Sequence, residues 1–412
     1  MSIAGFSLAK LIIMPLLLAV VALKPRRLLQ VCKHPVMLSG AAFLAWCSIA
    51  ELLHPYPDMG FVYRVAQVFV FAALIAAVAS DPAAFRRVLS ALVFTCSALA
   101  LYLVYNFYGS VSSEVGGFRE ASRLRDQALS EISLDTGLNI LGYTVGMGAV
   151  IALSRFLYAK DRKTRVLWGS MFTLCAVGTF IPLSRGALVA LVTASLLVLF
   201  RNRKRLMKPA VLFTLLALVV LVVSFFPPAL MQRYLFFRED RTATKKVEDG
   251  RFKLMSAAVD TLPEYWALGI GSGHYWKSWA APRGFGRLTL KGQAVIGPHN
   301  GFLAAWIYFG APGLALLLLI CIVSVRSIPG KESQSTESAA IIGLLGLGFI
   351  WMMFTHSLYL KTFSVILGML MAGSARAAYA WTKSRPLSLA SMAGASRWGY
   401  RARPAGWGRL GR

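Results

Sequence analysis

The sequence has 412 residues, of which 57% are hydrophobic and only 15% are charged. Soluble globular enzymes usually hold about 45–50% apolar and about 25% charged residues, so this composition excludes an ordinary soluble enzyme. The 44 Lys and Arg against 17 Asp and Glu give a net charge of +27, which would also suit a nucleic-acid-binding protein. However, the basic residues stand between long apolar runs, so the sequence predicts a membrane protein with no nucleic-acid partner.

Eleven apolar runs are candidate membrane-spanning helices. The clearest extends from Pro209 to Pro228 without a charge, and at about 1.5 Å per residue it matches the roughly 30 Å hydrocarbon thickness. The first run is followed by the basic segment KPRR at 24–27 rather than by a small-residue cleavage site, so we expect it to be retained. The predicted spans are 3–23, 36–53, 61–80, 88–108, 137–158, 167–184, 186–200, 209–228, 300–323, 338–357 and 361–380.

The positions of Lys and Arg predict the orientation of these spans. With the N-terminus outside, most short basic connections share one side with the C-terminal tail, and the positive-inside bias makes that side cytoplasmic. The long outer connection is also basic, which indicates either a functional loop or a solvated loop beside acidic lipid headgroups. We therefore expect about eight helices in 1–228, a periplasmic loop with short amphipathic helices in 229–299, about three helices in 300–380 and a basic cytoplasmic tail in 381–412.

Cysteine usage and motif content limit the chemistry. The five cysteines lie in or beside the spans and none lies in the longer outer loops, which argues against a disulfide framework. The sequence has no CxxC, no HExxH and no acidic pair at the spacing that a metal site usually needs. We therefore expect neither a metal nor a cofactor.

The first candidate motif is Leu183-Ser184-Arg185 at the outer start of the span 186–200. Ser184 is a suitable N-cap, and Arg185 would then stand in the first helical turn, where a cation opposes the helix dipole. That cost is explained if Arg185 and the free N–H groups of the helix start together hold a phosphate. The alternative is an arginine that only extends to the membrane interface.

The second motif lies in the long outer loop. Arg251 precedes a stretch in which Phe252, Met255, Val259 and Leu262 recur at helical spacing, which predicts a short amphipathic helix lying on the membrane domain. GIGSG follows at 269–273. Because no strand precedes it, we interpret it as a structural turn rather than as a nucleotide site.

The third motif is Pro298-His299-Asn300 before the span 300–323. His299 would stand at the outer mouth of a helix, where an imidazole can accept a proton. An ordinary interfacial histidine is the alternative. The catalytic interpretation is favoured because the predicted topology brings Arg185, Arg251 and His299 to one face.

These motifs resemble the bacterial O-antigen ligase and polymerase superfamily. The resemblance rests on SRGA at 184–187, Arg251 leading to GIGSG, PHNGFL at 298–303, FGAPGL at 309–314 and the long outer loop. It implies an all-α polytopic inner-membrane glycosyltransferase with about 11–12 membrane helices and a GT-C-like architecture. It also implies transfer of a glycan from undecaprenyl diphosphate to the lipid A core oligosaccharide at the periplasmic face, with inversion at the anomeric carbon and without a metal.

For such a transfer we predict a single displacement. Arg185 and Arg251 would bind the diphosphate and stabilise its growing charge, while His299 would accept a proton from the attacking sugar hydroxyl or orient that hydroxyl. His274 is a weaker candidate because it lies in the glycine turn. The other expected substrate contacts are Ser184, Asn300, His356 and Arg64.

Two departures and three alternatives accompany this resemblance. Tyr308-Phe309 stand where relatives often carry an acidic residue, and eleven spans are counted where relatives often have about twelve. An O-antigen polymerase shares the layout and the lipid donor. A protein O-oligosaccharyltransferase usually has a larger periplasmic C-terminal region. A lipid or glycan transporter would explain the spans without chemistry, although the sequence shows no internal repeat.

Overall fold

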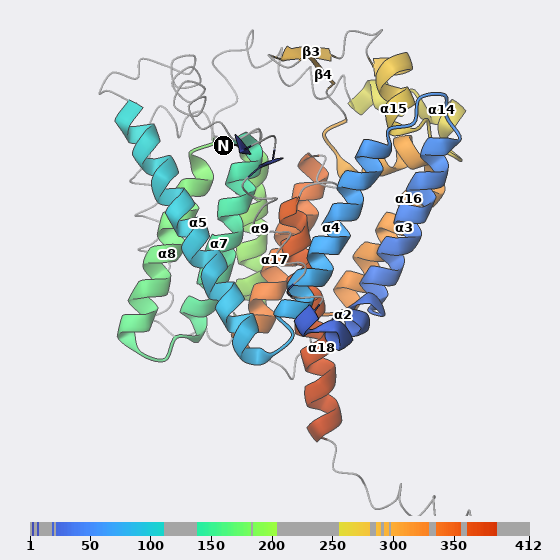
Figure 1. Cartoon of the computed structure of the whole chain (residues 1–412). Helices are drawn as coiled ribbons and strands as arrows, with labels where there is room; N and C mark the ends of the chain where they lie inside the picture. Colours follow the sequence, from blue (N-terminus) through green and yellow to red (C-terminus); the bar gives the residue numbers. More distant parts are fainter. Residues whose placement is uncertain are drawn as a thin grey trace, which may run out of the picture.

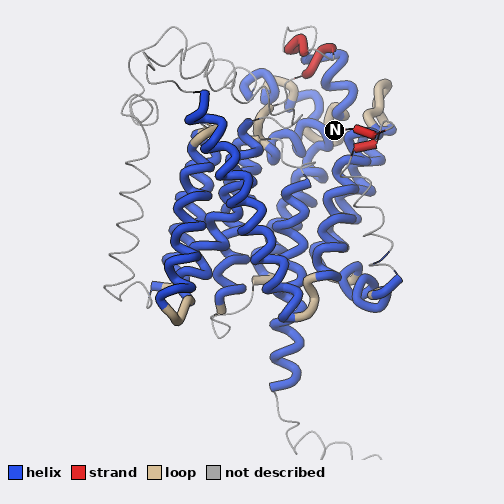
Figure 2. The backbone as a smooth tube through the Cα atoms, turned by 60° about the vertical axis from the view of Figure 1, so that its left-hand side comes forward, coloured by secondary structure: helices blue, strands red, loops and turns tan. Residues whose placement is uncertain are grey.

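The computed structural model describes residues 2–3, 6–7, 19, 22–110, 138–182, 184–203, 255–280, 286–289, 292–295, 298–328, 335–355 and 361–384. Within them the protein is a bundle of long helices that run alternately up and down (Figures 1 and 2). The long helices are α3 (Pro35–Leu52), α4 (Met59–Val78), α5 (Pro82–Ser110), α7 (Leu138–Tyr158), α8 (Arg162–Phe180), α9 (Arg185–Arg201), α16 (Gly301–Arg326), α17 (Thr336–Phe354) and α18 (Lys361–Ser384), and the short helix α2 (Pro25–Cys32) lies at the bottom of the bundle in Figure 1.

Short elements lie above the bundle in Figure 1. They are α14 (Leu262–Tyr265), α15 (Ser272–His274), the π-helical turn η1 (Tyr275–Ala280) and the antiparallel pair β3 (Gly286–Thr289) and β4 (Gly292–Val295). We call this the upper end; α3 and α17 end there, and α4, α9 and α16 begin there. The sheet content of the described chain is small, and the predicted all-α class is confirmed.

Six of the described helices are long and apolar enough to cross a membrane, namely α3, α4, α5, α7, α16 and α17. This confirms a multi-pass membrane protein. Most predicted spans in 36–200 and 300–380 coincide with a helix to within a few residues. The predicted span 209–228 lies outside the described residues.

The first predicted span, 3–23, differs from the structure at its start, while residues 19, 22 and 23 are helical and most of the span lies outside the described residues. The proposed first span, 3–23, does not begin as a helix, because Ser2–Ile3 (β1) pairs with Phe6–Ser7 (β2) in a short antiparallel hairpin. The cross-strand pair of Ile3 and Phe6 joins a β-branched and an aromatic residue, which favour strands. Apolar content alone did not distinguish this strand pair from a helix start.

Polar residues at the connections start the helices. Asp58 Oδ1 accepts the Phe61 N–H at 3.0 Å before α4, and Asp161 Oδ1 accepts the Thr164 N–H at 2.7 Å before α8. Such N-caps satisfy backbone donors that have no partner within the helix. The hydrogen bond from the Thr164 backbone also lowers the pKa of the Asp161 carboxyl below its ordinary value. Each connection therefore fixes where the next span begins.

Small residues let the central helices approach closely. α7 is the most enclosed of the six spans. A methyl group on its Gly148 would lie 2.3 Å from Cys96 Cβ of α5, and one on Gly178 of α8 would lie 2.6 Å from Ala100 Cβ. Close backbone approach through small residues is the usual way in which helices pack in lipid, where apolar burial gives little driving force.

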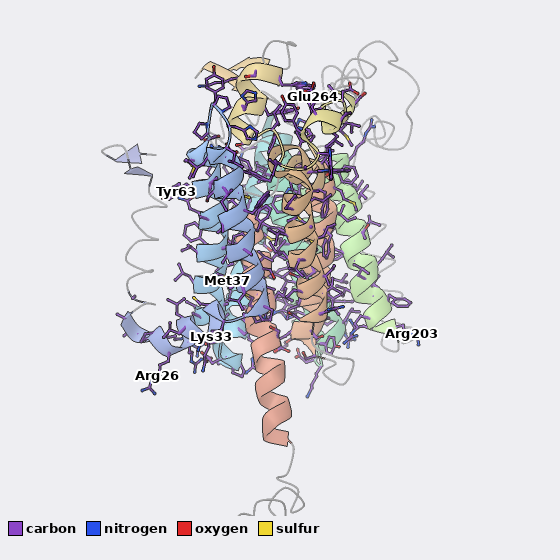
Figure 3. All side chains as sticks on the ribbon, turned by 90° about the vertical axis from the view of Figure 1, so that its right-hand side faces the viewer. Arg26, Lys33, Met37, Tyr63, Arg203 and Glu264 are labelled. Carbon is purple, nitrogen blue, oxygen red and sulfur yellow. The ribbon has the colours of Figure 1, made fainter. Side chains whose placement is uncertain are left out.

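The lower end of the bundle is basic. Arg26, Lys33 and Arg203 lie there, whereas Tyr63 and Glu264 lie at the upper end (Figure 3). Arg86, in the second turn of α5, and Arg162, the first residue of α8, also lie at the lower end, where both helices begin. The grouping agrees with the basic connections expected on one side, and the cytoplasmic assignment of that side stays a prediction.

Helix α16 is broken in its upper half. Gly310 has a left-handed φ of 68°, and Pro312 follows two positions later. The break leaves carbonyl groups of the preceding turn without helical donors. Trp46 Nε1 of α3 donates to the Phe309 carbonyl at 2.7 Å, which satisfies one of them. Broken helices at membrane depth require such partners because water does not reach them.

Candidate functional site

The start of α9 forms one side of the candidate site. Ser184 is buried, and its hydroxyl accepts the Ala187 N–H at 3.3 Å, so it caps the helix as predicted. Arg185 is the first helical residue and is partly exposed. The next residue, Gly186, packs tightly, because a methyl group there would lie 2.4 Å from Tyr143 Oη and 3.0 Å from Phe354 Cβ. The start of α9 is therefore held between α7 and α17.

The start of α16 forms the other side. Asn300 is the N-cap, and its Oδ1 accepts the N–H groups of Phe302 and Leu303, both at 3.0 Å. His299 precedes it with φ of 48°, the one left-handed residue other than glycine in the described chain. Such backbone conformations cost about 1–3 kcal/mol and cluster at functional sites. The double cap holds His299 at the mouth of α16.

Both helix starts meet the end of the same helix, α17. Gly186 of α9 faces Phe354, the last residue of α17. A methyl group on Gly301 of α16 would lie 3.3 Å from the Met352 carbonyl oxygen and 3.6 Å from that of Thr355. Motifs more than 110 positions apart in sequence are therefore both brought into contact with the end of α17, at the upper end of the bundle.

This arrangement suits an anion. Two helix N-termini open at the same end, and each presents backbone N–H groups and the positive end of a helix dipole. Arg185 adds a permanent positive charge and a planar group that can bind two oxygens of one phosphate. No cluster of His, Cys, Asp or Glu among the described residues is arranged to hold a metal. The site's own groups can thus bind a phosphate and can accept or orient a proton through His299.

Other predicted site residues have different positions. Arg251 and His356 lie outside the described residues, so their roles stay predictions. Arg64, on the second turn of α4, pairs with Asp58 at 3.4 Å and lies over the Phe61 ring. Its expected contact with substrate likewise stays a prediction.

The amphipathic stretch of the loop packs only in part as expected. Leu262 packs against the core, whereas Met255 and Val259 are 37% and 47% exposed. Ala258 and Thr261 are instead the residues turned toward the body of the protein.

The glycine motif is a structural turn, as predicted. It docks onto the break in α16, where Ile270 N–H donates to the Ile307 carbonyl at 2.8 Å and Gly271 N–H donates to the Tyr308 carbonyl at 3.0 Å. In return, Ala311 N–H donates to the Trp266 carbonyl at 2.8 Å. Gly269 has φ of 80°, and a methyl group on it would lie 2.4 Å from the Tyr308 carbonyl oxygen. The loop therefore replaces the hydrogen bonds that the helix break removes.

Glu51 was not among the predicted site residues. It lies on the last turn of α3 and is fully buried, and its carboxylate accepts the Asp58 N–H at 2.9 Å and the Ser272 N–H at 2.6 Å. The sequence did contain a signal, because Glu51 is the only acidic residue in any of the predicted spans. Burying an ionisable residue in a membrane span costs free energy, and such residues are usually functional.

A stack of rings lies beside this carboxylate. The His54 ring stacks on His274 with centroids 5.8 Å apart, His274 stacks on Tyr56 at 5.8 Å, and Lys277 Nζ lies 4.6 Å from the Tyr56 centroid. Burial, with the nearby His274, lowers the pKa of His54 from its ordinary value. His274 thus belongs to the contact between the loop and the α3–α4 turn. This position agrees with the expectation that His274 is a weaker catalytic candidate than His299.

Comparison with known proteins identifies the motif region. Residues 170–318 match the family described as O-antigen ligase. This region of the chain is similar to that family. The matched region begins within α8, includes α9 and ends within α16, so it holds both helix starts of the candidate site. The family resemblance drawn from the motifs is confirmed.

Curated proteins and solved structures were compared with the chain as well. No curated protein matches this chain. Four chains of solved structures match. One belongs to the structure described as "Structural coordination of polymerization and crosslinking by a peptidoglycan synthase complex"; it is 16% identical, and the match covers 82% of this chain and 96% of that chain with a TM-score of 0.41.

Proposed function

We propose that this protein is an O-antigen ligase of the bacterial inner membrane. It transfers a glycan from undecaprenyl diphosphate to the lipid A core oligosaccharide at the periplasmic face, without a metal. The observation that carries the proposal is that the helix starts of Arg185 and His299 both contact the end of α17, within the region that matches the O-antigen ligase family.

The reaction is a single displacement. A hydroxyl oxygen of the acceptor sugar attacks the anomeric carbon of the donor, and the bond from that carbon to the diphosphate oxygen breaks. The electron pair of that bond leaves with undecaprenyl diphosphate. His299 accepts the hydroxyl proton or orients the hydroxyl, and attack opposite to the leaving group inverts the anomeric carbon.

Positive charge drives departure of the diphosphate. Arg185, the N–H groups at the α9 start and the expected Arg251 stabilise the negative charge that grows on the leaving group. Ser184 caps α9 and Asn300 caps α16, so these two residues fix the positions of the charge and of the imidazole. Because diphosphate is a good leaving group, a strong base is not essential, and orienting the hydroxyl is a sufficient role for His299.

Reconstitution with defined substrates tests the proposal. The purified protein is incubated with undecaprenyl diphosphate-linked glycan and lipid A core, without nucleotide and with a metal chelator present. We expect glycan on the core oligosaccharide, and we expect its loss in Arg251→Ala and His299→Ala. Arg326→Ala, at the lower end of α16, is the matched control that should retain transfer.

The products distinguish the alternatives. Longer glycan on the lipid carrier would identify a polymerase, which shares the superfamily and the donor. No new glycosidic bond, combined with movement of the lipid-linked glycan across a bilayer, would identify a transporter. Either result would contradict the ligase proposal.

A further inference from the structure

Glu51 connects three segments at the upper end of the bundle. It belongs to the last turn of α3, it accepts the Asp58 N–H at the start of α4, and it accepts the Ser272 N–H in the loop. The loop contact joins residues 221 positions apart and measures 2.6 Å. Each carboxylate oxygen therefore has its own backbone donor, and both bonds are charge-assisted.

The connection continues from the loop to α16. Gly271 and Ile270, immediately before Ser272, donate to the Tyr308 and Ile307 carbonyls. Those carbonyls belong to the upper part of α16, between its N-cap and its break at Gly310. This part of the helix begins directly after His299 and Asn300. The contacts thus form one continuous path from Glu51 to the candidate site.

These contacts restrain the upper part of α16, which its own helical hydrogen bonds do not hold in place. The break at Gly310 interrupts the hydrogen bonds that would otherwise hold the upper part of α16 in line with its lower part. Gly273 fits equally closely against the α3–α4 turn, because a methyl group there would lie 2.1 Å from the Tyr56 carbonyl oxygen. The loop is therefore fixed on the side of α3 as well as on the side of α16.

We infer that Glu51 is a positioning residue for glycan transfer. It holds the glycine loop against the break in α16 and thereby keeps the start of α16, with His299, in its place beside the α17 end. The inference rests on the proposed function for its catalytic consequence, and its structural part stands apart from that function. Glu51 itself does not contact substrate in this account.

The test removes one hydrogen bond. Glu51→Gln retains size but turns an NH2 group toward one of the two backbone N–H donors, so one contact is lost. Hydrogen–deuterium exchange is measured on peptides covering 266–275 and 298–309 in the full-length purified protein. We expect exchange to become about 10- to 100-fold faster in both peptides, since hydrogen bonds to charged groups are the stronger ones. We also expect kcat of transfer to fall at least tenfold with little change in KM.

A second variant removes the same contact from the other partner. Ser272→Pro lacks the N–H group, and proline is tolerated at the first position of a helix, where Ser272 stands. Ser272→Pro should show the same faster exchange and the same loss of kcat. It replaces Glu51→Gln in the test if that variant does not accumulate. Ser272→Ala keeps the N–H and loses only a buried hydroxyl without a hydrogen-bond partner among the described residues. Ser272→Ala and Glu264→Gln, an exposed carboxylate of the same loop, should behave like wild type.

The outcomes separate the two proposals. Wild-type exchange in Glu51→Gln and Ser272→Pro would overturn the inference, and so would faster exchange confined to 266–275 with unchanged kcat. Faster exchange in both peptides, in a protein whose wild type transfers no glycan, would support the bracing role and contradict the proposed function.

Discussion

Tyr143 lies flat against Trp351, with ring centroids 4.7 Å apart and ring planes 5° from parallel. Both side chains are almost fully buried, and they join α7 to α17. The Tyr143 hydroxyl reaches the α9 start, 2.4 Å from where a methyl group on Gly186 would stand. This aromatic pair therefore helps to position the start of α9 and the end of α17, which meet at the candidate site.

We predict that Tyr143→Ala destabilises the protein and impairs transfer together. Loss of a buried aromatic ring costs about 3–5 kcal/mol, and the void would let the Arg185 end of α9 shift. Tyr143→Phe keeps the stacked ring and should be much less destabilised. Thermal unfolding in detergent measures the difference, with Tyr63→Ala, a tyrosine that is 66% exposed, as control. Equal effects of the two alanine variants would contradict this role of the pair.

Replacement of Arg185 by Lys should reduce transfer although the charge is kept. A guanidinium binds two phosphate oxygens with fixed geometry, whereas an ammonium acts as a point charge. We expect kcat/KM to fall about 10- to 100-fold, the equivalent of one charged hydrogen bond. Arg201→Lys makes the same change at the other end of α9 and should have little effect. Full activity in Arg185→Lys would exclude a forked contact with diphosphate.

Replacement of His299 should separate activity from stability. Both His299→Ala and His299→Gly remove the imidazole, so transfer should fall by about 10²- to 10⁴-fold in each. Only glycine adopts a φ of 48° without strain, and the glycine variant should therefore be more stable than the alanine variant by about 1 kcal/mol. Steady-state kinetics and thermal unfolding of the same samples give both quantities. If the glycine variant is active, the imidazole has no chemical role.

Acidic pH should weaken the contact between the loop and the α3–α4 turn. Burial and the nearby His274 lower the pKa of His54 in the folded protein, so the unfolded state binds a proton more readily as pH falls below about 6.5. The stability that His54 contributes is thus present above pH 6.5 and is lost as pH falls below it. Glu51 opposes this shift, while Lys277 stands at the far end of the ring stack.

A titration of thermal stability between pH 7.5 and 5.5 measures this effect. His34 at the lower end has a pKa lowered by burial too, so the informative quantity is the difference between wild type and His54→Phe. We expect the wild type to lose more stability on acidification than the variant. Parallel pH profiles would show that His54 does not titrate with folding.

Most helices were predictable because each is a run of apolar residues bounded by charged or capping residues. α4, for example, was predicted at 61–80 and occupies Met59–Val78, with Asp58 as its cap. The break in α16 was not predicted as such, although Gly310 and Pro312 are visible signals, because whether a membrane helix bends depends on what can satisfy its freed carbonyls. Here those partners, Trp46 and the 270–271 backbone, come from distant segments.

The candidate site was partly predictable. Ser184 and Asn300 are residue types that favour the N-cap position, so they mark helix starts in the sequence. The alternating direction of the spans then places both starts at the same end of the bundle. Their common contact with the α17 end could not be predicted, since it depends on which helices pack together. Glu51 was missed because its partners are backbone N–H groups, which leave no pattern in the sequence.

The central claim is that Arg185 and His299 serve one transfer reaction, and a double-mutant cycle tests it most directly. The rate of glycan transfer to lipid A core is measured for wild type, Arg185→Ala, His299→Ala and the double variant. Groups that act as a unit show strongly non-additive losses, so the double variant should be scarcely slower than the slower single variant. If the two losses multiply, the residues act independently, and the single site described here would be contradicted.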